Sequence, residues 1–257
     1  MAVSRDTGCR EMENTHFSRI YHQVSKDVYK NGPVISVDEK DWLDDWKTVY
    51  YKTYPRFEKI KLKAEVLHAD FFDLIVRRES RRDFTKEAVD LRTLSLLLKY
   101  SCGVTGIVKD VRSRRAYPSG GARYPIEIYP IVFRSSNDLE AGIYHYSVKE
   151  HMLDVVWKRS FSENDIDMLF TYPWVKNASM CILMTAVFWR TENKYREKSY
   201  EYILLEAGHI SQNVYLVSEA LGIKCTAMAG LRPDKIERLL DIDGFSESVI
   251  YSLVVGT

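Results

Sequence analysis

Residues 115–129, Arg-Ala-Tyr-Pro-Ser-Gly-Gly-Ala-Arg-Tyr-Pro-Ile-Glu-Ile-Tyr, combine a basic, turn-forming segment with the start of an apolar strand. The turn consists of Pro118, Ser119, Gly120 and Gly121. It supplies a fixed φ, a hydroxyl group and two residues without Cβ, so its backbone amides can closely approach a planar or anionic ligand. The β-branched and aromatic residues from 126 to 133 predict a strand that holds the turn. A Gly-Gly turn is also common in ordinary hairpins, so this segment alone does not identify a ligand site.

The composition of the 257-residue chain is that of a packed globular protein, with 46% hydrophobic residues. A formal net charge of +1 argues against a protein that binds nucleic acid by neutralising many phosphates. The four cysteines lie far apart, which disfavours a zinc site or a disulfide framework. The first residues lack the apolar core of a signal peptide, and no apolar run is long enough to span a bilayer. We therefore expect a reduced, cytoplasmic protein without a membrane span.

A second polar segment, Arg78-Glu-Ser-Arg-Arg-Asp-Phe84, follows a helix predicted to begin at Phe71. Alternate residues of an extended chain share a face, so Arg78, Ser80 and Arg82 are expected on the same side. Two guanidinium groups and a hydroxyl group suit a phosphate and the polar edge of a pyrimidine-like ring. An ordinary basic surface segment fits the same pattern.

The rest of the chain predicts alternating helices and strands. Helices are expected to begin at Asp90 and Ser162 and to cover residues 203–221 and 233–240, and strands are expected at 126–133, 142–146, 153–157, 178–189 and 248–255. The strand at 178–189 is apolar almost throughout, which is typical of a central strand covered on both faces. His145 and His151 lack partners at metal-ligand spacing, and we expect structural roles for both.

The long helix at 203–221 carries an apolar stripe with small residues beside it. Gly208, Ser211 and Ser218 are expected to form a face that another helix could approach closely. His209 lies beside the stripe, and we expect a hydrogen-bonded structural histidine.

Lys194 and Tyr195 follow the predicted central strand. In a partly desolvated pocket, a lysine loses part of its preference for the charged form, and proton abstraction becomes feasible. The same dipeptide is common on protein surfaces, so the residues alone leave its role open.

Taken together, four segments resemble the SagB-type dehydrogenases. These are flavin-dependent members of the nitroreductase superfamily that oxidise azolines to thiazoles and oxazoles in modified peptides. The matching segments are Tyr117 to Tyr129, similar to P-S-x-G-x-x-Y-P-x-E-x-Y, then Arg78 to Phe84, Lys194-Tyr195, and Leu205-Glu-Ala-Gly-His-Ile-Ser-Gln-Asn213. The family usually has K-Y-G-x-R-x-Y-R-Y after the Lys-Tyr pair, whereas this chain has Arg196, Lys198 and Glu201 where a glycine and two arginines are common.

The resemblance implies an α+β, nitroreductase-like fold with a central, mostly antiparallel sheet flanked by helices, and a homodimer with FMN at the subunit interface. It also implies which residues bind FMN, namely Arg78, Ser80, Arg82, Pro118, Ser119, Gly120, Gly121, Ala229 and Gly230. The Lys194–Tyr195 pair is implied as the catalytic dyad that removes a proton from the azoline ring. No metal is expected.

We expect two parts, a helical, aromatic-rich extension at 1–66 and the FMN-binding domain at 67–257. The extension packs on the domain or forms a platform for a peptide or carrier-protein substrate. The expected function is FMN-dependent oxidation of such a bound azoline in natural-product biosynthesis, beside a cyclodehydratase or synthetase partner. The alternatives are an NAD(P)H-dependent reductase of nitro compounds or quinones and a flavin-bound scaffold subunit. The identity of the substrate stays open.

Overall fold

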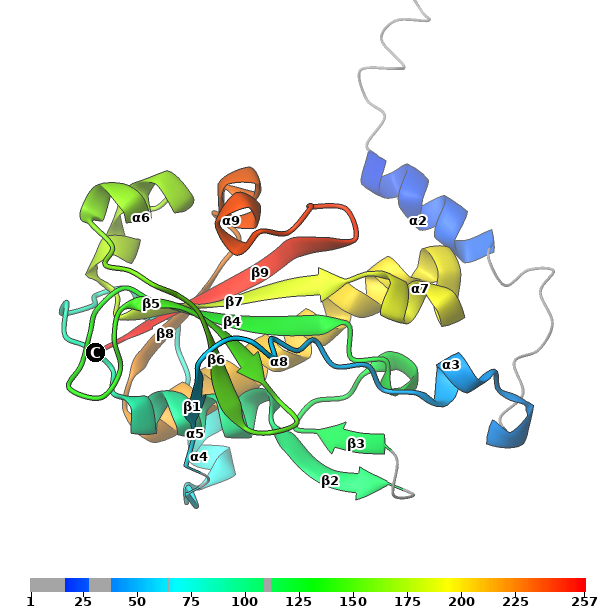
Figure 1. The fold of residues 1–257 in the computed structure, drawn as a ribbon, viewed down its shortest axis with the longest axis horizontal. Helices are drawn as coiled ribbons and strands as arrows, with labels where there is room; N and C mark the ends of the chain where they lie inside the picture. The colour runs from blue at the N-terminus through cyan, green and yellow to red at the C-terminus, as the bar shows by residue number, and fades with distance from the viewer. Residues whose placement is uncertain (1–16, 28–37, 64, 109–111) are drawn as a thin grey trace, which may run out of the picture.

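The computed structural model describes residues 17–27, 38–63, 65–108 and 112–257, and its main body is one seven-stranded sheet (Figure 1). The strand order is β1-β6-β5-β4-β7-β9-β8, and all neighbouring strands are antiparallel. The strands are β1 (Lys59–Lys61), β4 (Ile126–Val132), β5 (Gly142–Ser147), β6 (Met152–Lys158), β7 (Met180–Val187), β8 (Lys224–Met228) and β9 (Glu247–Gly256). The predicted central antiparallel sheet is confirmed.

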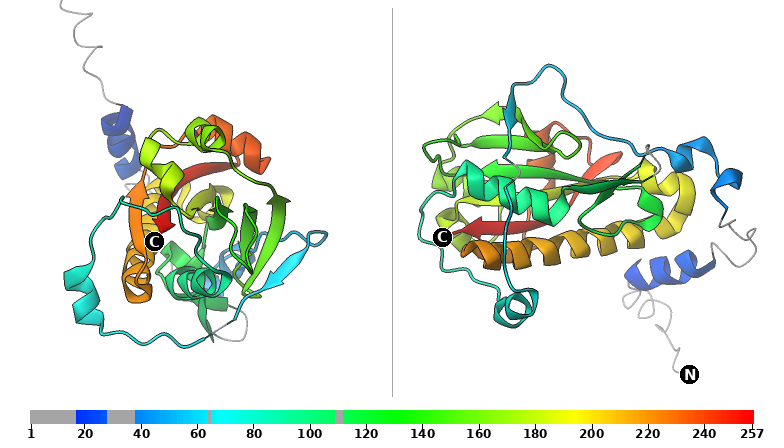
Figure 2. Two further views of the ribbon diagram at one scale, coloured as in Figure 1. Left: turned by 90° about the vertical axis from the view of Figure 1, so that its left-hand side faces the viewer. Right: turned by 90° about the horizontal axis from the view of Figure 1, so that it is seen from below.

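Helices cover both faces of the sheet (Figure 2). The helices around the sheet are α4 (Phe71–Arg77), α5 (Leu91–Cys102), α6 (Glu163–Leu169), α7 (Trp189–Tyr195), α8 (Ser199–Leu221) and α9 (Pro233–Leu240). On one face, Leu97 of α5 and Ile210 of α8 belong to the same buried cluster as Ile128 of β4. On the other face, Ile166 of α6 and Ile236 of α9 lie in a second buried cluster. The sheet is therefore the middle of three layers.

The two central strands show why the chain forms these layers. Every residue of β4 is buried, and the side chains alternate between the two clusters, with Ile126 and Ile128 on one side and Tyr129 and Ile131 on the other. Strand β7 is buried over nearly its whole length in the same way. A strand covered on both faces has no polar side, which explains why the two sequences are apolar apart from Glu127 and Thr185.

The ends of three helices follow the predicted signals. Asp90 caps α5 by accepting a hydrogen bond from the Thr93 amide at 2.8 Å. Ser162 and Asp165 form a reciprocal capping box at the start of α6. Gly222 ends α8 with a φ of +69°, a left-handed conformation that glycine adopts without strain.

The predicted strand at 178–189 is too long. Pairing with β9 ends at Val187, and the Glu192 amide then bonds to the Phe188 carbonyl as the chain turns into α7. The apolar sequence continues past the strand through Phe188 and Trp189, which hides the boundary. Lys194 and Tyr195 therefore lie at the end of a helix and not directly after a strand.

Short elements lie outside the main layers. They are α2 (Phe17–Asp27), η1 (Glu39–Asp41), α3 (Asp44–Lys47), η2 (Gly120–Ala122), η3 (Pro173–Asn177), η4 (Arg196–Lys198) and a ribbon of β2 (Val104–Val108) and β3 (Arg112–Arg115). The N-terminal part contributes β1 to the edge of the main sheet, where Ile60 pairs with Leu153. The division at residue 66 stays a prediction.

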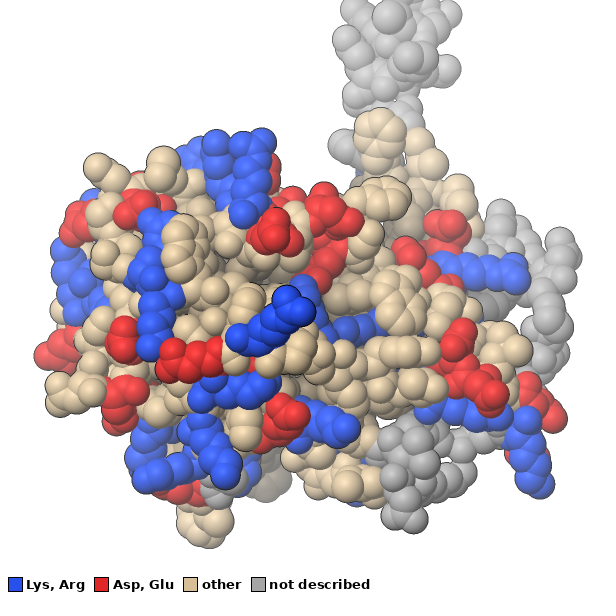
Figure 3. Space-filling model, in the orientation of Figure 1, with Lys and Arg blue, Asp and Glu red and all other residues tan. Residues whose placement is uncertain are grey.

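Lysine, arginine and acidic residues are interspersed on the surface that Figure 3 shows. Within the described ranges, no helix is long and apolar enough to cross a membrane. These ranges also contain no group of three side chains suited to hold a metal ion. Cys102, Cys181 and Cys225 are buried free thiols, and Cys9 lies outside the described residues.

Candidate active site

The Gly-Gly turn and the Lys194–Tyr195 pair lie against each other. Gly121 has a φ of +60°, and a Cβ added there would lie 2.5 Å from the Tyr195 hydroxyl oxygen and 3.2 Å from Lys194 Nζ. A Cβ on Gly120 would lie 3.6 Å from the Tyr202 ring of α8. The first position thus requires a residue that tolerates a left-handed backbone and occupies no side-chain space. The structure therefore brings the turn and the candidate dyad into one place.

Lys194 is shielded from solvent, and Tyr195 is half-buried. Lys194 is only 7% exposed, and its Nζ lies 3.4 Å from the ring centroid of Trp42 and 5.2 Å from that of Trp46. Burial raises the pKa of Tyr195 above its ordinary value. The phenol therefore keeps its proton at neutral pH and is a hydrogen-bond donor beside the lysine.

Glu206 is a buried acid beside the turn that sequence reasoning did not single out. It is 2% exposed, and burial raises its pKa to about 8, against the opposing effect of a hydrogen bond from Ser119. Its Oε1 has no hydrogen-bond partner among the described residues. The spacing could have revealed it, because Glu206 falls on the same face of α8 as the buried Ile203 and Ile210.

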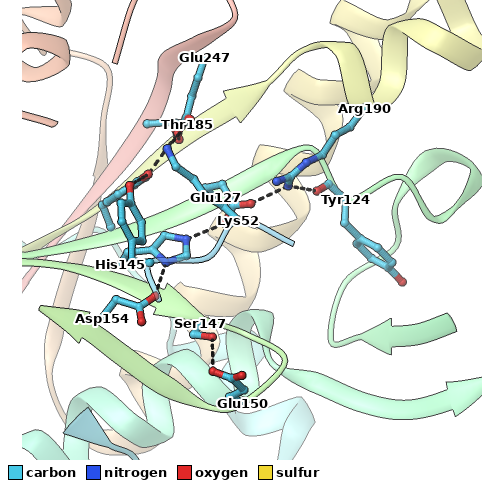
Figure 4. A network of polar contacts seen from close by, with 12 residues as sticks. Lys52, Tyr124, Glu127, His145, Ser147, Glu150, Asp154, Thr185, Arg190 and Glu247 are labelled. Carbon is cyan, nitrogen blue, oxygen red and sulfur yellow. Dashed lines mark hydrogen bonds and ion pairs between the residues drawn. The ribbon is translucent and has the colours of Figure 1, made fainter. Parts of the chain in front are cut away.

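A chain of buried charges anchors the helix that carries the dyad (Figure 4). His145 lies between Glu127, at 2.8 Å from its Nε2, and Asp154, at 3.0 Å from its Nδ1. Glu127 also accepts a 2.6 Å hydrogen bond from Arg190 of α7. Burial alone would raise the pKa of Glu127, but His145 and Arg190 lower it to about 2. Burial lowers the pKa of His145, but its bonds to the two carboxylates raise it above the ordinary value.

Arg123, the arginine of the turn segment, joins the turn to two other segments. It is 1% exposed, and its Nε donates to the Arg190 carbonyl at 2.8 Å. Its Nη1 donates to the carbonyls of Trp46 at 2.9 Å and Thr48 at 3.1 Å. The turn, α7 and the N-terminal extension are therefore fastened to one another.

The predicted phosphate-binding residues lie near the other end of α8. The Arg78 guanidinium lies 5.3 Å from the ring centroid of Tyr215, and Ser80 Oγ lies 2.9 Å from the Tyr215 hydroxyl. The Arg82 guanidinium lies 5.9 Å from the ring of Trp174. Arg78 and Ser80 thus share a contact, as expected of residues on one side of an extended segment.

The arginines of this segment differ in their charge partners. Arg77 and Arg81 both form ion pairs with Glu219. Among the described residues, no carboxylate forms an ion pair with Arg78 or Arg82. These two guanidinium groups therefore keep their charge available for an anionic ligand.

The predicted Ala229–Gly230 loop is close to this arginine segment. Tyr215, which contacts Arg78 and Ser80, accepts a 2.6 Å hydrogen bond from the Ala227 amide at the end of β8. Ala229 itself is exposed. A Cβ on Gly230 would lie 2.4 Å from the Tyr172 ring, so packing alone explains this glycine.

Helix α8 separates the predicted cofactor residues into two groups. Gly120 lies by Tyr202, and Arg78 lies by Tyr215, and these two positions are roughly 20 Å apart along the helix at 1.5 Å per residue. One chain therefore does not bring all the predicted FMN-binding residues together.

Two expectations about the surface of α8 are wrong. Ser211 and Ser218 are buried against the core, so they do not form an open small-residue face with the exposed Gly208. His209 is exposed and not a packed structural histidine. Because the side chain of Ile210 points into the core, Gly208 and His209 lie on the solvent side of the helix.

The sequence pattern of the nitroreductase family matches residues 75–257, and the chain belongs to this family. A nitroreductase protein of Methanocaldococcus jannaschii is 29% identical over 188 residues, which cover 73% of this chain and 88% of that protein. The trifolitoxin-processing protein TfxB of Rhizobium leguminosarum is 32% identical over 65% of this chain and 47% of its own length. The microcin B17-processing protein McbC of Escherichia coli is 28% identical over 72% of this chain and 73% of that protein. These relatives confirm the resemblance to the SagB-type dehydrogenases.

Solved structures show the same fold. A nitroreductase structure from Anabaena variabilis superposes with a TM-score of 0.70 at 23% identity and covers 94% of this chain, which spans 46% of that one. The E. coli microcin synthetase McbBCD complex contains a chain that superposes with a TM-score of 0.59 at 18% identity, over 98% of both chains. The nitroreductase-like fold is therefore confirmed.

Proposed function

We propose that the protein is an FMN-dependent oxidase that converts a thiazoline or oxazoline to the corresponding azole, in a peptide or a carrier-protein-bound substrate. The observation that carries the proposal is the close packing of Gly121 against a shielded Lys194–Tyr195 pair. The similarity to proteins named for processing microcin B17 and trifolitoxin supports a peptide substrate.

The residues present fit FMN. Arg78 and Arg82 have no carboxylate partner among the described residues, and Ser80 adds a hydroxyl group, which together suit the phosphate. At the other site, Gly120 and Gly121 have no Cβ of their own to cover their backbone amides, which suits the edge of a planar ring. When bound, the flavin supplies a two-electron acceptor.

In this proposal, the chain contributes proton transfer and shielding. Lys194 takes the proton from the azoline ring carbon, and Tyr195, which keeps its own proton, donates a hydrogen bond to the ring nitrogen. Glu206 holds a proton beside Ser119 and positions the turn without touching the substrate. Burial of Lys194 keeps bulk water from competing for the same proton.

We also propose a homodimer in which each FMN site takes the turn from one subunit and the arginine segment from the other. The roughly 20 Å between the two groups along α8 supports this arrangement. Exposed apolar side chains on α4 and α8 offer a contact surface, with Phe72 78%, Val76 84% and Leu205 58% exposed. Light scattering is expected to give the mass of two chains, and a monomer with full FMN affinity would contradict the shared site.

A synthetase partner that forms the azoline is part of the proposal. The E. coli McbBCD complex, solved with a truncated pro-peptide bound, supports it because one of its chains shares this fold. We expect the substrate to be delivered as a cyclised segment of a larger molecule.

An NAD(P)H-dependent reductase is the second candidate, and the similarity to the M. jannaschii nitroreductase favours it. The two functions differ in the electron donor. The test is to load the protein with FMN without oxygen and to add either NADPH or a thiazoline-containing peptide. Our proposal predicts that the peptide bleaches the flavin and loses two hydrogens by mass. Bleaching by NADPH alone would favour the reductase, and a protein that stays colourless with added FMN would leave only a scaffold.

A further inference from the structure

We propose that residues 38–48 of the N-terminal extension are part of the active site, where Trp42 and Trp46 position the side-chain nitrogen of Lys194. We call these two residues the indole pair. The inference rests on the proposed role of Lys194, and it turns the extension from a packed appendage into a contributor to the proton-transfer site.

The geometry around Lys194 carries the proposal. Its Nζ lies 3.4 Å from the ring centroid of Trp42, 5.2 Å from that of Trp46 and 5.6 Å from that of Tyr195. A cation within about 6 Å of an aromatic face is attracted by the ring, most strongly by tryptophan and most when water is excluded. With Lys194 only 7% exposed, this condition is met.

Hydrogen bonds hold the indole pair at the dyad. Trp46 Nε1 donates to the Asn193 carbonyl at 3.1 Å, directly before Lys194 in the chain. Arg123 of the turn segment donates to the carbonyls of Trp46 and Thr48. The extension is therefore bonded to both α7 and the turn, on each side of the lysine.

The indole pair also affects proton transfer by Lys194. Because an aromatic face favours the charged amine over the neutral one, the indole pair helps to determine the pH at which Lys194 becomes neutral. A residue that only fills space excludes water and lowers that pH, so its removal would move the midpoint in the opposite direction. This difference separates a positioning role from simple packing.

The test measures the reactivity of the Lys194 amine in the full-length protein, without substrate. An amine-reactive reagent is applied over a range of pH, and the modified Lys194 peptide is quantified by mass spectrometry. Trp42→Leu is expected to move the midpoint of modification about one pH unit lower, with about tenfold faster modification below the midpoint. Trp42→Phe, which keeps an aromatic face, is expected to lie between Trp42→Leu and the wild type.

The control is Trp157→Leu, which removes a 48% exposed tryptophan from β6 and should leave the midpoint at the wild-type value. Greater exposure of the amine alone would move the midpoint to higher pH, because water stabilises the charged form. If Trp42→Leu does not fold by circular dichroism, Trp42→Met replaces it with the same expectation. A folded Leu or Met variant with an unchanged or higher midpoint would overturn the proposal. A shifted midpoint in a protein that oxidises no azoline would support the contact and reject the proposed function instead.

Discussion

The two ends of α8 are built for different tasks. Near Tyr202, Lys194 and Glu206 are almost fully buried, and the backbone around them is fastened by bonds from Arg123. Near Tyr215, the arginine segment lies at the surface. A proton-transfer group must be shielded from water and held in place, whereas a cation that binds phosphate must not already be paired. One half of the proposed site is therefore buried and fastened, and the other half is open to solvent.

Breaking the buried charge chain is expected to have the largest effect on stability. Glu127→Gln leaves Arg190 and His145 without their shared carboxylate, so the free energy of unfolding should fall by about 3 to 5 kcal/mol at neutral pH. Because His145 and Arg190 lower the pKa of the buried Glu127 to about 2, its stabilisation is present above the ordinary value of 4.5 and is lost as pH falls toward 2.

Urea titrations at several pH values measure this difference. The control is Glu58→Gln, which removes an exposed ion pair with Lys158 and should cost under about 1 kcal/mol. A loss for Glu127→Gln as small as that of the control would contradict the anchoring role of the charge chain.

At the open end, Arg78→Ala is expected to weaken FMN binding by about 10- to 100-fold, because it removes a charged partner of the phosphate. The matched control is Arg77→Ala, the neighbouring residue that already pairs with Asp73 and Glu219. Flavin fluorescence titration gives both dissociation constants. Equal losses for the two variants would remove the distinction between paired and unpaired arginines.

At the buried end, Gly121→Ala is expected to lower turnover by about tenfold beyond any loss in stability. Gly222→Ala is the matched control, because both glycines have a positive φ and a Cβ on Gly222 would meet no atom within 4 Å. The left-handed backbone costs both variants about 1 to 2 kcal/mol. Only Gly121→Ala also presses on Tyr195 and Lys194, so equal turnover in the two variants would show that this contact has no role.

The smallest expected effect concerns Glu206. Because burial raises its pKa to about 8, the folded protein keeps a proton that the unfolded chain releases near 4.5, and stability falls as pH rises between these values. Glu206→Gln cannot ionise, so it should gain on the order of 1 to 2 kcal/mol relative to the wild type by pH 6 and close to nothing at pH 4. Calorimetry across this range measures the difference, and a constant offset would argue against a protonated Glu206.

Much of the fold could be predicted because local signals determine it. Asp90 and Ser162 mark helix starts through hydrogen bonds within a few residues, and the continuous apolar sequence of β7 marks its double cover. Of the three alternating residues Arg78, Ser80 and Arg82, the first two contact Tyr215, whereas Arg82 contacts Trp174.

The rest depends on contacts between distant parts of the chain. Nothing local to Trp42 indicates that its ring will lie over Lys194, and the boundary between β7 and α7 is hidden by apolar residues on both sides. Glu206 could have been found from its place on the apolar face of α8, but its neighbour Ser119 comes from the distant turn. The contacts that could not be predicted from the sequence are therefore the long-range contacts that form the site.

The most direct test of the proposed function compares the wild type with Lys194→Ala, both loaded with FMN, in a single anaerobic turnover with a thiazoline-containing peptide. Lys235→Ala, an exposed lysine on α9, is the control. We predict that Lys194→Ala binds FMN like the wild type but bleaches it at least about 100-fold more slowly, while Lys235→Ala matches the wild type. Bleaching by Lys194→Ala at the wild-type rate would contradict the assignment of the buried dyad as the proton-transfer site.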